Sequence, residues 1–291
     1  MAKGKRKKRQ IRPLRVGAAM LVLFALVIAL KNVKAEQPQP AGPVQKDAAA
    51  SVSQESSITE AVIPESAVQP PAEKEPLRVV YVTFDDGPCN HTPQVLDILD
   101  RYGVKATFFT VGCYVEKYPE HAAEIVRRGE TIGCHSYTHD YAQCYASADA
   151  FLNEVTRWEQ AVTAACGAVP ERECLRFPGG SRTHYADNVR DGIKNGLRQR
   201  GIHWYDWNAG DNDKWLAGNT QELPKTEYFR QSYRACMKWF DDMPEEPVIL
   251  LLHETEDGTV QILPEILEDL ISRGYVFRTL DQHPNWETPG T

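Results

Sequence analysis

The chain has 291 residues with 33 basic and 40 acidic side chains, which gives a net charge of −7 at neutral pH. Residues 1–34 hold ten of the basic residues and no acid, so the remainder carries 23 basic and 40 acidic residues, a balance of −17. A surface this acidic excludes nucleic acid as the expected partner, because phosphate binding needs the opposite charge.

Residues 1–35 predict a membrane-directed segment. A block rich in Lys and Arg is followed by an uninterrupted apolar run at 16–30. That run is short for a full membrane span and long enough for a signal core, and its basic flank marks the cytoplasmic side. Small residues near Ala35 are compatible with cleavage, whereas Lys31 and Lys34 favour an uncleaved signal-anchor. We expect a single-pass protein of the cell membrane with an extracytoplasmic domain, or a secreted one if the signal is cleaved.

Residues 36–76 predict a disordered linker. They are rich in Pro, Ala, Gln, Glu and Ser and have no sustained apolar period. Such a composition cannot bury enough apolar surface to order itself. We expect it to act as a tether that holds the domain at 77–291 away from a membrane, within reach of a cell-wall polymer.

From residue 77 onward, short apolar runs alternate with helix-like stretches, which is typical of an α/β domain. Strands are expected at 79–84, 106–111, 131–134, 175–177, 204–207, 248–252 and 275–279, and helices at 92–102, 119–128, 148–165, 186–200, 228–240 and 260–272. About seven strands alternating with helices predict a barrel or an open parallel sheet. Polar clusters follow the strands, so we expect one shared site at their carboxyl ends.

The first two clusters have the composition of a metal site. Asp85 and Asp86 end a strand at a Gly-Pro turn that can bring both into one cavity, and His135 and His139 follow about fifty residues later. One carboxylate and two imidazoles form a three-ligand divalent-metal site with an open position for water, on which the second carboxylate can act. Taken singly, the two acids are also compatible with a solvated strand-to-loop turn. The two histidines are also compatible with ordinary surface residues that bind no metal.

Three later strand ends carry further candidates. Arg176 can orient a carboxylate and keep it ionised, or can form a plain surface salt bridge. His253 follows a very apolar strand and can serve as a general acid, or can be a satisfied residue at the edge of the core. Residues 204–208 offer aromatic faces for sugar rings and an acid to orient a histidine, although core packing is the commoner use of such rings.

These clusters, in this order, resemble the polysaccharide deacetylases of carbohydrate esterase family 4. The matching segments are TFDDGP at 83–88, HSYTH at 135–139, RFPGG at 176–180, DWN at 206–208 and LLH at 251–253. The resemblance covers about residues 77–282. It implies a deformed (β/α) barrel that removes acetyl groups from N-acetylated sugars, and the membrane segment and linker expected from the composition would precede this barrel.

The resemblance also implies a role for each residue of the first clusters. Asp86, His135 and His139 would bind a divalent metal, usually zinc. Asp85 would be the base that takes a proton from metal-activated water, and Arg176 would hold Asp85.

The remaining roles concern the substrate side. A backbone N–H near Gly179 would help to stabilise the oxyanion, and His253 would protonate the leaving amine. Either Asp206 or Asp213 would orient His253, with Asp206 preferred. Trp207 would contact the substrate. One departure is that Gly179 stands where the family often has a tyrosine, so a ring that could shape the sugar pocket is lost.

The seven cysteines leave at least one thiol without an intramolecular partner. Cys166 and Cys174 lie close in sequence and could form a disulfide. Buried apolar thiols are the alternative.

We therefore expect a metal-dependent hydrolase of N-acetyl groups in a cell-wall or extracellular polysaccharide, first of all peptidoglycan amino sugars. One alternative is an O-acetyl esterase acting on xylan-type glycans. The other is a non-catalytic carbohydrate-binding barrel, which predicts the loss of at least one of Asp85, Asp86, His135, His139 or His253. All five are present, which argues against it.

Overall fold

The computed structural model describes residues 78–212, 223–243 and 246–284. The expected membrane-directed segment and linker lie outside the described residues, and so does Asp213. None of the described helices combines the length and the apolar character needed to cross a bilayer.

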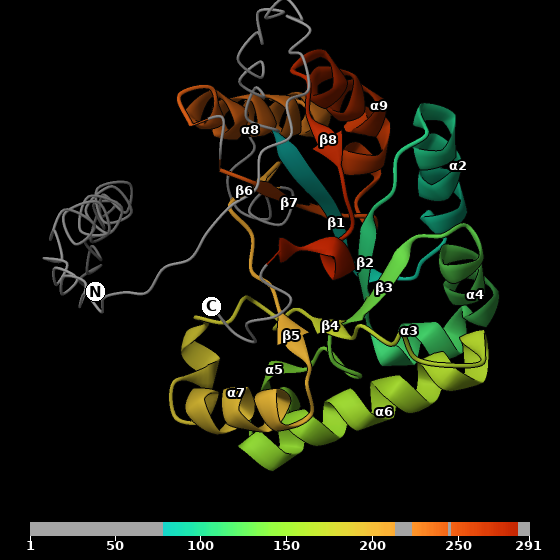
Figure 1. Ribbon diagram of the computed structural model, residues 1–291, viewed down its shortest axis with the longest axis vertical. Helices are drawn as coiled ribbons and strands as arrows, with labels where there is room; N and C mark the ends of the chain where they lie inside the picture. Colours follow the sequence, from blue (N-terminus) through green and yellow to red (C-terminus); the bar gives the residue numbers. More distant parts are fainter. Residues whose placement is uncertain (1–77, 213–222, 244–245, 285–291) are drawn as a thin grey trace, which may run out of the picture. The chain divides into compact units, whose positions relative to one another are not determined.

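The described strands form one sheet in which β1 is an interior strand between β2 and β7 (Figure 1). They are β1 Val79–Gly87, β2 Thr107–Thr110, β3 Thr131–Cys134, β4 Cys174–Leu175, β5 His203–Trp204, β6 Ala209–Gly210, β7 Val248–His253 and β8 Val276–Phe277. Their order is β5-β4-β3-β2-β1-β7-β6, β8 pairs with β1, and every pairing is parallel. The predicted parallel α/β architecture is confirmed, with one additional strand, because Ala209–Gly210 pairs with β7.

The helices connect successive strands and pack on one another around the sheet (Figure 1). They are α2 Thr92–Tyr102, α3 Gly112–Lys117, α4 Pro119–Arg127, α5 Tyr141–Cys144, α6 Ala148–Cys166, α7 Arg190–Gln199, α8 Lys225–Phe240 and α9 Asp257–Ser272. The sequence did not predict the short helices α3 and α5. The helix expected at 186–200 begins only at Arg190, after a 3-10 turn at His184–Ala186.

The two faces of β1 contribute to two apolar clusters. Val80, Val82 and Phe84 belong to the main core, together with apolar side chains from the helices. Tyr81 points to the other face and joins a smaller cluster that includes Phe109, Cys174, Tyr205 and Leu280. Side chains alternate along a strand, so Asp85 shares the face of Tyr81 and lies above this smaller cluster.

The register of the strands brings the polar clusters to one edge of the sheet. Asp85 on β1 lies opposite His253 on β7, and Cys134 on β3 lies opposite Leu175 on β4. His135 follows Cys134 and Arg176 follows Leu175, so these two residues leave the sheet side by side at the carboxyl ends of β3 and β4. The expectation that the strand ends converge is thereby confirmed for these four positions.

Three predicted strands are shorter in the structure. The strands expected at 175–177, 204–207 and 275–279 are reduced to β4, β5 and β8, each of two residues. For β4 the cause is local, because Pro178 has no N–H to donate and Gly179 has a φ of 75°. The backbone N–H groups of Arg176 and Tyr205, just beyond β4 and β5, still donate to the carbonyls of Cys134 and Leu175.

All seven cysteines are free, so the disulfide considered between Cys166 and Cys174 is not formed. Cys174 lies on β4 with its sulfur against Gly133 of β3, inside the sheet, whereas Cys166 ends α6. Burial raises the pKa of both thiols above the ordinary value, but only Cys174 is a buried cysteine, since Cys166 is half-buried.

Candidate metal and catalytic site

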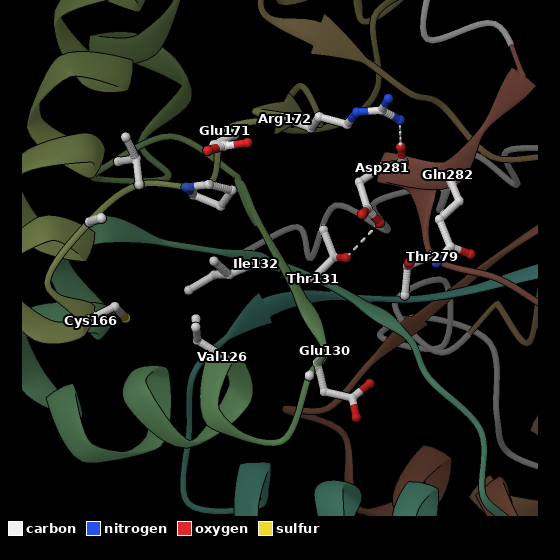
Figure 2. Close-up of a pocket in the computed structure, with 14 residues that line it drawn as sticks. Val126, Glu130, Thr131, Ile132, Cys166, Glu171, Arg172, Thr279, Asp281 and Gln282 are labelled. Atoms are coloured by element: carbon white, nitrogen blue, oxygen red, sulfur yellow. Dashed lines mark hydrogen bonds between the residues drawn. The ribbon is translucent and has the colours of Figure 1, made fainter.

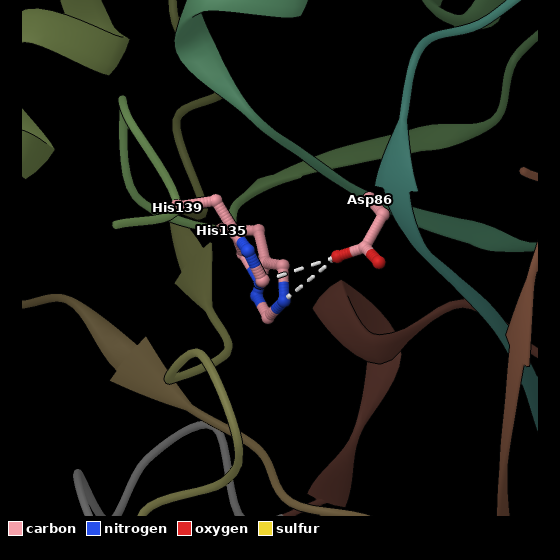
Figure 3. Close-up of side chains that lie close together, drawn as sticks. All are labelled: Asp86, His135 and His139. Atoms are coloured by element: carbon pink, nitrogen blue, oxygen red, sulfur yellow. Dashed lines mark ion pairs between the residues drawn. The ribbon is translucent and has the colours of Figure 1, made fainter. Parts of the chain in front are cut away.

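Asp86, His135 and His139 form a compact cluster of metal-ligating atoms (Figure 3). Asp86 Oδ1 lies 3.5 Å from Nε2 of His135 and 3.3 Å from Nε2 of His139. Atoms that share a tetrahedral ion at about 2.0–2.1 Å stand roughly 3.4 Å from one another. The spacing of the carboxylate and the imidazoles therefore fits a zinc-sized ion.

A β-bulge brings the adjacent acids to one cavity. The register between β1 and β2 shifts between Asp85 and Gly87, so Asp86 is the extra residue. Its φ of 69° lies in the left-handed region, which is strained for a side chain of this kind. Neighbouring residues of a regular strand would point to opposite faces, so the bulge is what allows both carboxylates to face the histidines.

The two imidazoles are fixed by the backbone around them. His135 Nδ1 donates a hydrogen bond of 2.8 Å to the carbonyl of Arg176, which leaves Nε2 to face the cluster. Ser136 and His139 both have positive φ, and the N–H of His139 donates to Ser136 Oγ. This loop ends where Asp140 caps α5. The site is thus preorganised by hydrogen bonds of the chain itself.

Asp85 lies beside the cluster and is held by Arg176. An Arg176 terminal nitrogen (Nη1) donates to Asp85 Oδ1 at 2.9 Å, while Asp85 Oδ2 is 3.7 Å from His135 Nε2. Arg176 is fully buried, and its Nη1 also donates to Thr83 Oγ1. A buried carboxylate needs such a counter-charge. The predicted contact between these two residues is present, and it turns one carboxylate oxygen toward the histidines.

Arg176 also anchors the loop that follows β5. Its Nε donates to the carbonyl of Tyr205 and its Nη2 to the carbonyl of Asp206. The guanidinium carbon lies 4.4 Å from the centroid of the Phe109 ring. One buried side chain therefore joins β1, β4 and the segment after β5 at the strand ends.

Asp206 contacts the loop after β4. Its two carboxylate oxygens accept hydrogen bonds from the N–H and the hydroxyl of Ser181, each at 2.7 Å. This gives Asp206 a role in fixing Ser181, at the end of the Gly179–Gly180 loop. Its predicted role in orienting His253 stays a prediction, and the alternative, Asp213, lies outside the described residues. His253 itself ends β7 and is buried.

Two glycines shape the loop at 179–180. Gly179 and Gly180 have φ values of 75° and 85°. The Gly180 N–H donates to the carbonyl of Phe177, whereas the Gly179 N–H has no hydrogen bond to any described residue. A Cβ at Gly180 would lie 3.2 Å from the Trp207 ring, so the absence of a side chain lets this ring approach. Trp207 is 40% exposed and presents an aromatic face beside the loop.

Sequence reasoning missed Glu254, which is fully buried behind the Asp86–Gly87 turn. A Cβ on Gly87 would lie 1.6 Å from Glu254 Oε1, so only glycine fits there. Burial, with a further contribution from Asp86, raises the pKa of Glu254 to about 8. The only sequence signal was its place directly after His253.

The Glu254→Gln variant is expected to change how stability depends on pH. In the metal-free wild type, the folded state holds a proton on Glu254 between pH 4.5 and about 8, where the unfolded chain has lost it. Stability therefore falls as pH rises through this window and levels off above it. Glutamine stays neutral, so the variant should gain on the order of 5 kcal/mol relative to wild type between pH 4 and pH 9.

Urea unfolding of both proteins without metal, at pH 4 and pH 9, measures this difference. Glu171 is exposed, so Glu171→Gln serves as the control and should follow the wild type at both pH values. An equal pH dependence in all three proteins would contradict the assignment of a neutral, buried Glu254.

A hollow of about 520 Å³ lies at the other end of the strands and has no part in this site (Figure 2). Its wall includes Thr131, the first residue of β3, whereas His135 follows the last. Thr131 donates to the Asp281 carboxylate, and Arg172 donates to the Asp281 carbonyl. In folds of this kind chemistry takes place at the carboxyl ends of the strands.

Comparison with known proteins agrees with this geometry. Residues 72–198 match the family model described as polysaccharide deacetylase. A chitooligosaccharide deacetylase of Bradyrhizobium sp. (strain ANU 289) is 37% identical over 210 residues, which are 70% of this chain and 90% of the relative. A peptidoglycan-N-acetylglucosamine deacetylase of Bacillus cereus is 26% identical over 209 residues, 72% of this chain and 71% of that protein.

The fold is similar to that of a solved structure as well. The catalytic domain of peptidoglycan N-acetylglucosamine deacetylase from Eubacterium rectale superposes with a TM-score of 0.61 at 29% identity. The match covers 70% of this chain and 88% of that domain.

Proposed function

Because the chain belongs to the polysaccharide deacetylase family, we propose that it removes N-acetyl groups from a cell-wall or extracellular polysaccharide, first of all the amino sugars of peptidoglycan. The observation that carries the proposal is the cluster of Asp86, His135 and His139 with a further carboxylate, Asp85, beside it. Of the two relatives described above, one is named for the N-acetylglucosamine of peptidoglycan and the other for chitooligosaccharides, which supports an amino-sugar glycan as the target.

Asp86, His135 and His139 would hold the divalent ion. One oxygen and two nitrogen ligands with space for a further ligand are typical of catalytic zinc sites. When bound, zinc would lower the pKa of water and would act as a Lewis acid that polarises the acetyl carbonyl.

The proton transfers fall to Asp85 and His253. Asp85 takes a proton from the attacking water, and its Oδ2 is the oxygen that Arg176 leaves available on the side of His135. His253 then gives a proton to the amine nitrogen as its bond to the acetyl carbon breaks. The two residues lie opposite each other in the register of β1 and β7, so they are suited to act at one substrate bond.

Two groups of the loop after β4 would bind the substrate. The Gly179 N–H, which has no hydrogen bond to described residues, is suited to receive the carbonyl oxygen as it becomes negative. The exposed face of Trp207 is suited to a sugar ring. With residues 1–35 as a signal-anchor and 36–76 as a tether, the catalytic domain would work on glycan outside the cytoplasm, at the cell membrane.

Acetate release tests the proposal. The zinc-loaded protein is incubated with peptidoglycan, with N-acetylglucosamine oligomers and with acetylated xylan, and released acetate is measured enzymatically. We expect release from the N-acetylated glycans. Release from xylan alone would indicate an O-acetyl esterase, and no release from any glycan would indicate a non-catalytic barrel.

Metal removal should abolish this release. Dialysis against a chelator is expected to reduce the rate to background, because Asp85 alone cannot make neutral water a sufficient nucleophile. Adding back one equivalent of zinc should restore it. An undiminished rate in protein shown to be metal-free by elemental analysis would refute metal dependence.

A further inference from the structure

The ring of Tyr141 occupies the space beside Gly179, where members of the family often carry a tyrosine. A Cβ on Gly179 would lie 2.9 Å from the Tyr141 hydroxyl oxygen and 3.1 Å from its Cε1. Any side chain at position 179 would therefore meet Tyr141, which belongs to a different element, the helix α5.

The ring of Tyr141 contacts the rings of His139 and Tyr185. Tyr141 is the first residue of α5, two positions after His139. Its ring meets the His139 imidazole edge-on, with the two ring centroids 5.7 Å apart. The centroid of the Tyr185 ring lies 4.7 Å from that of Tyr141. The Tyr141 ring therefore packs directly against a candidate metal ligand.

Two hydrogen-bond donors are unused at this point. Neither the Tyr141 hydroxyl nor the Gly179 N–H has a hydrogen bond to any described residue. The neighbouring Tyr145 differs, since its hydroxyl donates to the carbonyl of Pro178 at 2.8 Å and so serves the structure. A hydroxyl placed beside a free amide is suited to a shared acceptor, and an oxyanion is such an acceptor.

We propose that Tyr141 is a catalytic residue whose hydroxyl donates a hydrogen bond to the acetyl carbonyl oxygen as negative charge develops on it, together with the Gly179 N–H. The inference rests on the proposed function, because it needs an acetylated substrate at the metal cluster. If the ring served only to fill space, phenylalanine would replace it without loss.

The test compares Tyr141→Phe with Tyr137→Phe. Tyr137 lies in the loop that leads into α5, and its hydroxyl donates to the exposed Glu116, so it is a matched control. We expect Tyr141→Phe to lower kcat on N-acetylglucosamine oligomers by about 100-fold, the loss typical of one oxyanion donor. KM and zinc content should stay near wild type, and Tyr137→Phe should leave all three nearly unchanged.

A binding measurement separates the transition state from the ground state. Affinity for N-methylphosphonyl glucosamine, a tetrahedral anion, should fall by about the same factor as kcat in Tyr141→Phe. Affinity for tetra-N-acetylchitotetraose, measured by calorimetry in an Asp85→Asn background, should change little. A wild-type kcat would overturn the inference, as would a loss confined to KM or to zinc content.

The outcomes also separate this inference from the proposed function. If wild-type protein releases no acetate from any glycan, both fail. If wild type is active and Tyr141→Phe is equally active, only the role of Tyr141 fails.

Discussion

Replacing Asp85 with Asn is expected to abolish acetate release while the protein still binds zinc. Asparagine keeps an oxygen that can accept from Arg176, but it cannot take a proton from water. Loss of a general base lowers turnover by about 10³-fold or more when no other group substitutes for it. Asp85 lies beside the three-residue ligand cluster and is not one of its members, so zinc affinity should be retained.

Zinc content by elemental analysis and kcat on N-acetylglucosamine oligomers together check this result. The variant leaves the buried Arg176 without its counter-charge, so circular dichroism must first show that the protein is folded. Asp97 is an exposed acid on α2, and Asp97→Asn should behave as wild type. A variant that has lost its zinc would contradict the separation of Asp85 from the metal ligands.

Replacing Asp86 with Asn is expected to cost both zinc affinity and turnover. Asp86 supplies the anionic oxygen that both histidines face, at 3.3 and 3.5 Å. Removal of a residue that only hydrogen-bonds to a metal ligand already weakens metal binding by about 10–100-fold. Removal of a ligand itself should therefore weaken zinc binding by more than about 100-fold. His135→Ala and His139→Ala should have the same effect, because each removes one of the two imidazoles.

Competition with a zinc-chelating dye measures the dissociation constants of these variants. Asp85→Asn is the control, since it differs from Asp86→Asn by one position and keeps the cluster. Retention of zinc by Asp86→Asn and its loss from Asp85→Asn would mean that the roles of the two adjacent acids are exchanged.

Much of the site follows from strand positions that are visible in the sequence. The carboxyl ends of parallel strands meet at one edge, so polar residues after separate apolar runs come together whatever the loops do. This reasoning predicted that the acids, the histidines and Arg176 share one site, and the family resemblance implied the contact between Asp85 and Arg176, which are 91 positions apart, and the grouping of Asp86 with the two histidines.

What the sequence did not predict depends on loops and on contacts between distant residues. The bulge at Asp86 and the positive φ of His139 have no clear local signal, because neither residue is glycine. The sequence shows a glycine at position 179, but only the packing of α5 reveals that the Tyr141 ring lies against it. The contact between Asp206 and Ser181 likewise joins two loops whose paths are set by tertiary structure.

Anomalous diffraction at the zinc edge, from a crystal of the zinc-loaded protein, tests the central claim most directly. The account predicts one strong peak at about 2.0–2.2 Å from an Asp86 oxygen and from Nε2 of His135 and His139, with Asp85 beyond bonding distance. A peak bonded to Asp85 or to a cysteine sulfur, or no peak at the strand ends, would contradict it.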